Sequence, residues 1–228
     1  MGALGRLVML MMPITPRFVV GWVAKRYVAG PDLESALQVM RSMKSQGACF
    51  TLDVLGEEIT SLEEANFFVN EYHRALDAII AEDMDANISL KPTAFGLLID
   101  EKQALENIEK ITRIASKNNI FVRLDMEDNR VTQSTIDIVI EMHNRGLTNI
   151  GTVLQSRLFR TGEDITSLSS KLGGYSDVRI CKGIYLEPED IAHTKYHEIV
   201  LATNNAIDDL LDAGAYTAIA SHDIPIID

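Results

Sequence analysis

The sequence has few cysteines and few basic residues, and each shortage excludes a class of protein. Its two cysteines, Cys49 and Cys181, lie in apolar, strand-like runs and form neither a CxxC motif nor a Cys/His spacing. This pattern predicts two buried structural thiols in a reducing compartment, without a disulfide framework. Lysine and arginine number 21 against 33 aspartates and glutamates, so the net charge is −12. An acidic balance spread along the whole chain disfavours nucleic acid as a partner.

The sequence also lacks long hydrophobic runs. The apolar stretch from Leu7 to Met12 is interrupted by Pro13 and Pro16, whereas a membrane-spanning helix needs about 20 apolar residues. We therefore expect neither a transmembrane helix nor a signal peptide. Residues 18–28 have the pattern of an amphipathic lead-in that packs on the domain, with a loose contact to a membrane surface as the alternative. The expected location is cytoplasmic, with peripheral attachment to the inner face of the membrane left open.

What the chain does contain is a repeated pattern of a short run rich in Val, Ile and Leu followed by a segment with helical periodicity. The starts of these runs lie roughly 25 to 40 residues apart, which is the length of a βα unit. Such alternation predicts an α/β fold with a parallel sheet and helical cover. No run is followed by GxGxxG, so a (βα)8 TIM-type barrel is favoured over an open dinucleotide-binding sheet. The predicted strands span 48–53, 87–91, 120–125, 150–155, 178–182 and 217–221.

These strands account for about six of eight βα units, and the last two are expected to be missing from this sequence. We expect a single domain over 1–228, with N-terminal helices in 1–47 and barrel units 1 to 6 in 48–228. Helix starts are marked by Thr60 and Glu63, which match a capping box, and by Thr161 and Asp164.

Every predicted strand ends on a polar or charged side chain. In barrels of this class the active site lies at the C-terminal ends of the strands, and charges there are costly unless they are paired or used. The pattern therefore predicts one functional pocket, with ordinary strand-to-loop junctions as the alternative. The strand-end residues are Asp53, Lys91, Asp125, Gln155, Lys182, Ser221 and the adjacent His222.

Several of these residues have more than one interpretation. Asp125 could be a helix N-cap or the ion-pair partner of Arg123. Lys91 could form a Schiff base, as in aldolases, or could simply bind an anion. His193 and His197 share a helix face at four-residue spacing, but no HExxH motif or third ligand accompanies them, so we expect no metal site.

Six motifs in order resemble those of monofunctional bacterial proline dehydrogenases, and the resemblance runs from about Arg26 to the end of the chain. The third strand carries Arg-Leu-Asp-Met-Glu-Asp, the fourth Val-Leu-Gln-Ser-Arg-Leu-Phe-Arg-Thr, and the fifth Arg-Ile-Cys-Lys-Gly-Ile-Tyr-Leu-Glu-Pro. Leu-Asp-Val-Leu-Gly-Glu, Ser-Leu-Lys-Pro-Thr and Ser-His-Asp complete the set. The six motifs span 123–128, 153–161, 179–188, 52–57, 89–93 and 221–223.

The resemblance implies oxidation of L-proline to 1-pyrroline-5-carboxylate with FAD, and transfer of electrons to a membrane quinone. It also implies a downstream pyrroline-5-carboxylate dehydrogenase as a partner in proline degradation. It places Asp125 and Arg179 among the active-site residues and Lys91 in substrate binding. The positions that match FAD contacts are Met126, Gln155, Lys182, Gly183, Ile184, Ser221 and His222.

The sequence departs from the family pattern at three places. Ile184 stands where the family usually has alanine, and Ser221 replaces threonine. The family's Tyr-x-x-Arg-Arg-x-x-Glu motif, whose arginines bind the proline carboxylate, would lie beyond residue 228. We therefore expect this chain alone to turn over proline poorly. A non-catalytic truncated barrel remnant is the main alternative, and a Schiff-base aldolase using Lys91 or Lys182 is a further one.

Overall fold

The computed structural model describes residues 28–227, which fall into two compact units divided after Cys49. In the first unit, the helix α3 (Leu33–Lys44) begins after Asp32, whose carboxylate accepts the Ser35 backbone N–H at 2.9 Å. This is a standard N-cap contact. The predicted lead-in over 18–28 lies, apart from Val28, outside the described residues. Among the described residues, no helix is long and apolar enough to cross a membrane.

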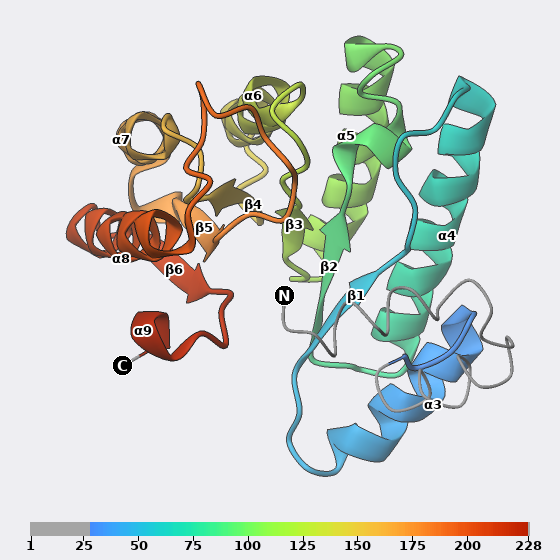
Figure 1. The fold of residues 1–228 in the computed structure, drawn as a ribbon. Coiled ribbons are helices and arrows are strands. Elements are labelled where there is room, and N and C mark those ends of the chain that lie inside the picture. The colour runs from blue at the N-terminus through green and yellow to red at the C-terminus, as the bar shows by residue number, and fades with distance from the viewer. Residues whose placement is uncertain (1–27, 228) are drawn as a thin grey trace, which may run out of the picture. The chain divides into compact units, whose positions relative to one another are not determined.

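The second unit contains a six-stranded parallel sheet whose strands are hydrogen-bonded in sequence order (Figure 1). This confirms the predicted α/β fold with a parallel sheet, which here curls into a half-barrel. All six residues of β4 are buried, as expected for a strand covered on both faces. The strands are β1 (Phe50–Asp53), β2 (Ala86–Leu90), β3 (Val122–Leu124), β4 (Ile150–Gln155), β5 (Asp177–Cys181) and β6 (Tyr216–Ile219).

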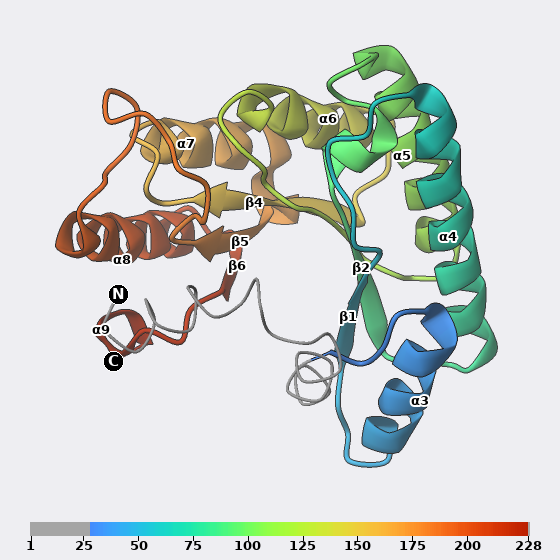
Figure 2. The same cartoon turned by 45° about the vertical axis from the view of Figure 1, so that its right-hand side comes forward.

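Helices connect successive strands and cover one face of the sheet (Figure 2). Each long helix buries one stripe of side chains; α4, for example, buries Phe68, Tyr72 and Leu76. Such a stripe faces the sheet because apolar residues recur with the helical period. The helices and short turns of this unit are α4 (Leu62–Ala81), η2 (Pro92–Phe95), α5 (Glu101–Lys117), α6 (Thr132–Asn144), α7 (Thr161–Leu172), η3 (Gly173–Tyr175), α8 (Tyr196–Asp212) and α9 (Ile224–Ile227).

Two predicted helix starts differ in detail from the structure. The N-cap of α4 is Ser61, not Thr60, and its side chain accepts the backbone N–H of Glu64. Thr60 instead donates its backbone N–H and its hydroxyl to the Glu64 carboxylate. Thr161 does not cap α7, because its hydroxyl donates to the Gln155 carbonyl at 2.7 Å.

A buried ion pair joins β3 to β5 across β4. The Arg123 guanidinium lies 2.6 Å from the Asp177 carboxylate and also donates to the carbonyls of Thr152 and Asp177, both at 3.1 Å. Gly151 makes this possible, because a Cβ there would lie 3.0 Å from the guanidinium and 2.3 Å from the Asp177 carbonyl oxygen. Arg123 thus pairs with Asp177, and the alternative that paired it with Asp125 is wrong.

The two cysteines form no disulfide, as predicted, but they are not both buried. Cys49 is exposed and Cys181 is half-buried. Cys49 lies outside the sheet because β1 begins only at Phe50. The prediction of a buried structural thiol is therefore wrong at Cys49.

Candidate functional site

Asp125 and Arg179 form an ion pair at the carboxyl ends of the strands. Asp125 directly follows β3, where its backbone N–H donates to the Leu90 carbonyl at 2.8 Å. Its carboxylate accepts the Ser89 hydroxyl at 2.7 Å and an Arg179 N–H at 3.3 Å. Both partners of the ion pair are about one-quarter exposed, at 22% and 27%. The structure therefore brings the two residues predicted for the active site together, and it orients Asp125 toward Arg179 rather than toward Lys91.

Lys91 belongs to a second group of side chains at the same ends of the strands. Its ammonium lies 3.2 Å from a carboxylate oxygen of Glu57, which also accepts the Tyr185 hydroxyl at 3.3 Å. Burial alone would lower the pKa of Lys91, but the hydrogen bond to Glu57 and the surrounding negative groups raise it overall. Burial raises the pKa of Tyr185 to about 12. Lys91 is thus a protonated, partly buried cation that can bind an anion.

Lys182 lies in a third group, which links β5 to the segment after β6. Its ammonium is 2.7 Å from the Asp223 carboxylate and lies over the Tyr196 ring, 5.6 Å from the centroid. Asp223 also accepts the Tyr196 hydroxyl at 2.8 Å. The hydrogen bonds from Lys182 and Tyr196 lower the pKa of Asp223. The lysine is therefore held in place by two side chains from separate elements.

Gln155, the last residue of β4, lies against the backbone of Gly183 in the segment after β5. The Gln155 amide nitrogen donates to the carbonyls of Met126 at 3.2 Å and Glu127 at 2.8 Å. Its oxygen Oε1 is buried and has no hydrogen-bond partner among the described residues. Gly183 has φ +96°, and a Cβ there would lie 2.7 Å from that oxygen. An acceptor without a hydrogen-bond partner therefore lies beside a backbone conformation that favours glycine.

The other predicted cofactor residues lie close to these groups in the chain. Met126 is buried and follows Asp125, and Ile184 follows Gly183 with 85% of its surface exposed. Ser221 accepts the Asp223 backbone N–H at 3.1 Å, whereas His222 is exposed. The exposed position of Ile184 shows that its extra bulk points away from packed protein.

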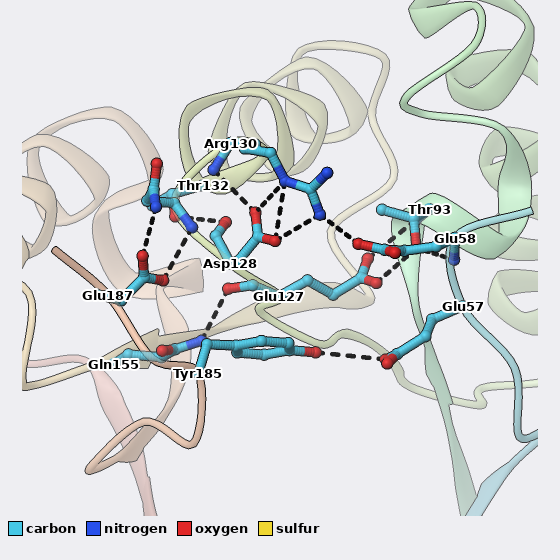
Figure 3. A network of polar contacts seen from close by, with 11 residues as sticks. Glu57, Glu58, Thr93, Glu127, Asp128, Arg130, Thr132, Gln155, Tyr185 and Glu187 are labelled. Carbon is cyan, nitrogen blue, oxygen red and sulfur yellow. Dashed lines mark hydrogen bonds and ion pairs between the residues drawn. The ribbon is translucent and has the colours of Figure 1, made fainter.

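The loops after the strands are joined to one another by buried or partly buried carboxylates (Figure 3). Glu127, after β3, accepts both the backbone N–H and the hydroxyl of Thr93, after β2. Glu187, after β5, accepts the backbone N–H and the side-chain amide of Asn129. Arg130 pairs with Glu58 in the loop after β1. These contacts hold the rim of the site on which Lys91 lies.

The predicted helical histidine pair is wrong in one respect. α8 begins only at Tyr196, so His193 precedes the helix that carries His197. The described part of the chain contains no group of three or more His, Cys, Asp or Glu side chains suited to hold a metal ion.

The sequence interpretation missed four polar residues of the site: Ser89, Glu127, Tyr185 and Asp223. Each lies within one of the quoted motifs, one or two residues from a residue that was singled out. Their presence in a motif was the available signal. However, the partner of Glu127 lies 34 residues away in the chain, and the partner of Tyr185 lies 128 residues away. Their roles therefore depended on tertiary contacts.

The fold and the site together define a class: a parallel α/β protein of sequentially ordered strands with paired charged groups at the carboxyl ends. The sequence model of the family described as proline dehydrogenase matches residues 36–226. Proline dehydrogenase 2 of Bacillus subtilis (strain 168) is 36% identical over 205 residues, covering 90% of this chain and 66% of that protein. The chain belongs to the proline dehydrogenase family.

Other similar proteins agree with this family assignment and with the fold. Proline dehydrogenase of Deinococcus radiodurans is 32% identical over 214 residues, covering 90% of this chain and 67% of that protein. The crystal structure of proline utilization A from Bdellovibrio bacteriovorus, inactivated by N-propargylglycine, superposes with a TM-score of 0.81 at 23% identity. That match covers 90% of this chain and 26% of the other, and it supports the fold. The chain thus spans about 66% of the length of its Bacillus relatives.

Proposed function

We propose that this chain carries most of the site of a flavin-dependent enzyme that oxidises L-proline to 1-pyrroline-5-carboxylate. In this proposal the electrons pass to a membrane quinone, and the product passes to a pyrroline-5-carboxylate dehydrogenase. The protein acts in the cytoplasm, at the inner face of the membrane. The six strands are part of a single (βα)8 barrel domain, because the curled sheet has its strands in sequence order with helices on one face.

The observation that carries the proposal is the unused acceptor of Gln155. A buried oxygen without a partner is costly unless a ligand satisfies it, and the flavin ring presents an N–H donor at its pyrimidine end. The absence of a Cβ at Gly183 lets its backbone lie close to the Gln155 side chain, since a Cβ there would be 2.7 Å from Gln155 Oε1. These features fit FAD. The residues that would hold it are Met126, Gln155, Lys182, Gly183, Ile184, Ser221 and His222.

Bound FAD would supply the acceptor for the hydride removed from the carbon next to the proline nitrogen. Two cations, Arg179 and Lys182, would stabilise the negative charge that this transfer delivers. Asp125 holds Arg179 through the 3.3 Å ion pair. Lys91 would bind the substrate carboxylate as a point charge. We assign no base, because the proline nitrogen can lose its proton to solvent before the hydride leaves.

The aldolase alternative fits these side chains less well. A Schiff-base lysine must lose its proton to act as a nucleophile, and such lysines have a lowered pKa. The pKa of Lys91 is raised instead, and Lys182 is bound to Asp223. Trapping of a substrate on either lysine by borohydride would favour the aldolase and count against the flavin site.

The proposal is tested by adding FAD to the purified chain and to the variant Gln155→Leu. Gln133→Leu, which replaces an exposed glutamine on α6, is the matched control. We expect the wild type and the control to retain FAD with visible flavin absorbance, and Gln155→Leu to retain much less. Proline-dependent reduction of an artificial acceptor then tests the reaction itself. A colourless wild-type protein that FAD cannot reconstitute would instead support the non-catalytic remnant.

A further inference from the structure

Glu127 is a buried carboxylate that the proposed reaction does not use. It is 3% exposed and lies two residues after Asp125. Its two oxygens accept the Thr93 backbone N–H at 2.9 Å and the Thr93 hydroxyl at 2.5 Å. Burial is the main cause that raises its pKa. A carboxylate placed at this depth needs a compensating contact, and a single threonine supplies both hydrogen bonds.

Thr93 connects Glu127 to both sides of the Lys91–Glu57 ion pair. It lies two residues after Lys91, in the turn η2 for which Lys91 is the N-cap. Its hydroxyl oxygen also accepts the Glu58 backbone N–H at 2.8 Å, and Glu58 directly follows Glu57. One buried hydroxyl thus holds the backbone beside each partner of the pair.

The backbone at Glu58 supports this interpretation. Its φ is +51°, in the left-handed region that non-glycine residues seldom adopt. Such a conformation persists only when surrounding contacts hold it, and the hydrogen bond to Thr93 is one of them. The partners Lys91 and Glu57 are 22% and 47% exposed, so an ion pair between them would be mobile without a rigid support.

We propose that Glu127, acting through Thr93, is a positioning residue that holds the Lys91 ammonium in place for the substrate carboxylate. This inference rests on the proposed function for the identity of the bound carboxylate. The placement of Lys91 itself is a property of the chain, and it can be measured without FAD or proline.

The chain offers a matched control for this inference in Glu187. That carboxylate is also buried, at 8% exposed, and it also accepts two hydrogen bonds from a single residue, Asn129, in a neighbouring loop. Its hydrogen bonds to Asn129 do not lead to Lys91. A general effect of removing a buried carboxylate from the rim would therefore appear equally in Glu127→Gln and Glu187→Gln.

The test is the rate at which an amine-reactive acylating reagent modifies Lys91, followed by peptide mass spectrometry of the full chain over a range of pH. The variants are Glu127→Gln, Thr93→Val, Thr93→Ser and Glu187→Gln. The charged and titratable groups that act on Lys91 are Glu57, Tyr185 and Glu127, together with Asp53.

Loss of the hydrogen bonds between Glu127 and Thr93 should expose the Lys91 amine and lower its pKa. We expect Glu127→Gln and Thr93→Val to react on the order of three- to tenfold faster at a given pH, because Glu127→Gln removes a negative charge near Lys91 and Thr93→Val removes the hydroxyl that links Glu127 to the turn after Lys91. Thr93→Ser keeps the hydroxyl and should react as the wild type does. Glu187→Gln should stay within about twofold of the wild type, because its hydrogen bonds are to Asn129 and not to Thr93 or Lys91.

Wild-type rates in both Glu127→Gln and Thr93→Val would overturn the proposal, as would an equal increase in Glu187→Gln. If Glu127→Gln loses its far-ultraviolet circular dichroism signal and is therefore unfolded, the comparison of Thr93→Val with Thr93→Ser decides whether the proposal holds. Unfolding of both Glu127→Gln and Thr93→Val would also overturn it, because the contact would then support the fold and not the lysine.

A separate arm tests the proposed function. L-proline should slow the acylation of Lys91 in the wild-type chain, whereas D-alanine at the same concentration should not. Absence of protection would count against proline as the ligand, and it would leave the comparison among the variants unaffected.

Discussion

Removal of the Asp177 carboxylate should destabilise the sheet, because it leaves a buried guanidinium without its counter-ion. The Arg123 side chain is 6% exposed and that of Asp177 is 21% exposed, with 2.6 Å between Nη2 and Oδ1. Breaking a buried pair by removing one partner costs about 3–5 kcal/mol. Two hydrogen bonds from Arg123 to backbone carbonyls remain in Asp177→Ala, so we expect the lower value, about 3 kcal/mol.

The assay is urea unfolding followed by far-ultraviolet circular dichroism, with thermal unfolding as a second measure. For a domain of this size, a loss of about 3 kcal/mol corresponds to a fall in Tm of about 6–12 °C. Asp177→Asn, which keeps an acceptor oxygen but no charge, should lie between the wild type and Asp177→Ala. The control is Glu141→Ala, which removes an exposed ion pair with Arg145 on α6 and should cost no more than about 0.5 kcal/mol.

The reasoning would be refuted if Asp177→Ala lost less than about 1 kcal/mol, the value of an ordinary exposed pair. An effect equal to that of Glu141→Ala would have the same meaning. Either result would show that the Arg123 guanidinium is satisfied by the carbonyls alone.

Three further predictions concern the site. Gly183→Ala should retain less FAD, measured by flavin absorbance after gel filtration, because the new Cβ would lie 2.7 Å from Gln155 Oε1 at φ +96°. Asp53→Asn should gain stability relative to the wild type as pH rises. Burial, opposed by the Tyr72 hydrogen bond, raises the pKa of Asp53 in the folded protein, so the stability that protonated Asp53 contributes is fully present below its unfolded pKa and is lost as pH rises through its folded pKa. Urea unfolding of both proteins at about pH 4 and about pH 7 measures this difference. Lys91→Ala, in an active form of the enzyme, should raise KM for proline about tenfold or more with a smaller change in kcat, and an unchanged KM in steady-state kinetics would contradict its role.

The order of the secondary structure was predictable from the sequence because its signals are local. The run at 150–155 is mostly apolar before its final glutamine, and β4 has those bounds. Other boundaries shifted by one or two residues; β3, predicted over 120–125, spans only Val122–Leu124. Strand ends depend on how far the neighbouring strand continues to offer hydrogen bonds, which is not encoded in the strand alone.

The placement of polar residues at the strand ends was predictable for the same reason, since a strand-end position is defined by the apolar run before it. Which of these residues would pair was not predictable. Arg123 was the charged residue considered as the partner of Asp125, but Asp125 contacts Arg179 instead. Arg123 forms an ion pair with Asp177, because Gly151 leaves the space between β3 and β5 open for the guanidinium.

The sequence by itself determined that this chain is a parallel α/β protein of the proline dehydrogenase type, with a row of polar groups where its strands end. Only the tertiary structure decided how that row divides into ion pairs, which buried oxygen stays unused, and which carboxylate supports Lys91. The reason is physical: hydrophobic periodicity acts over a few residues, whereas Tyr185 and Glu57 meet across 128 residues of chain. Such contacts are set by the register of one strand against the next, and register exists only once the sheet has formed.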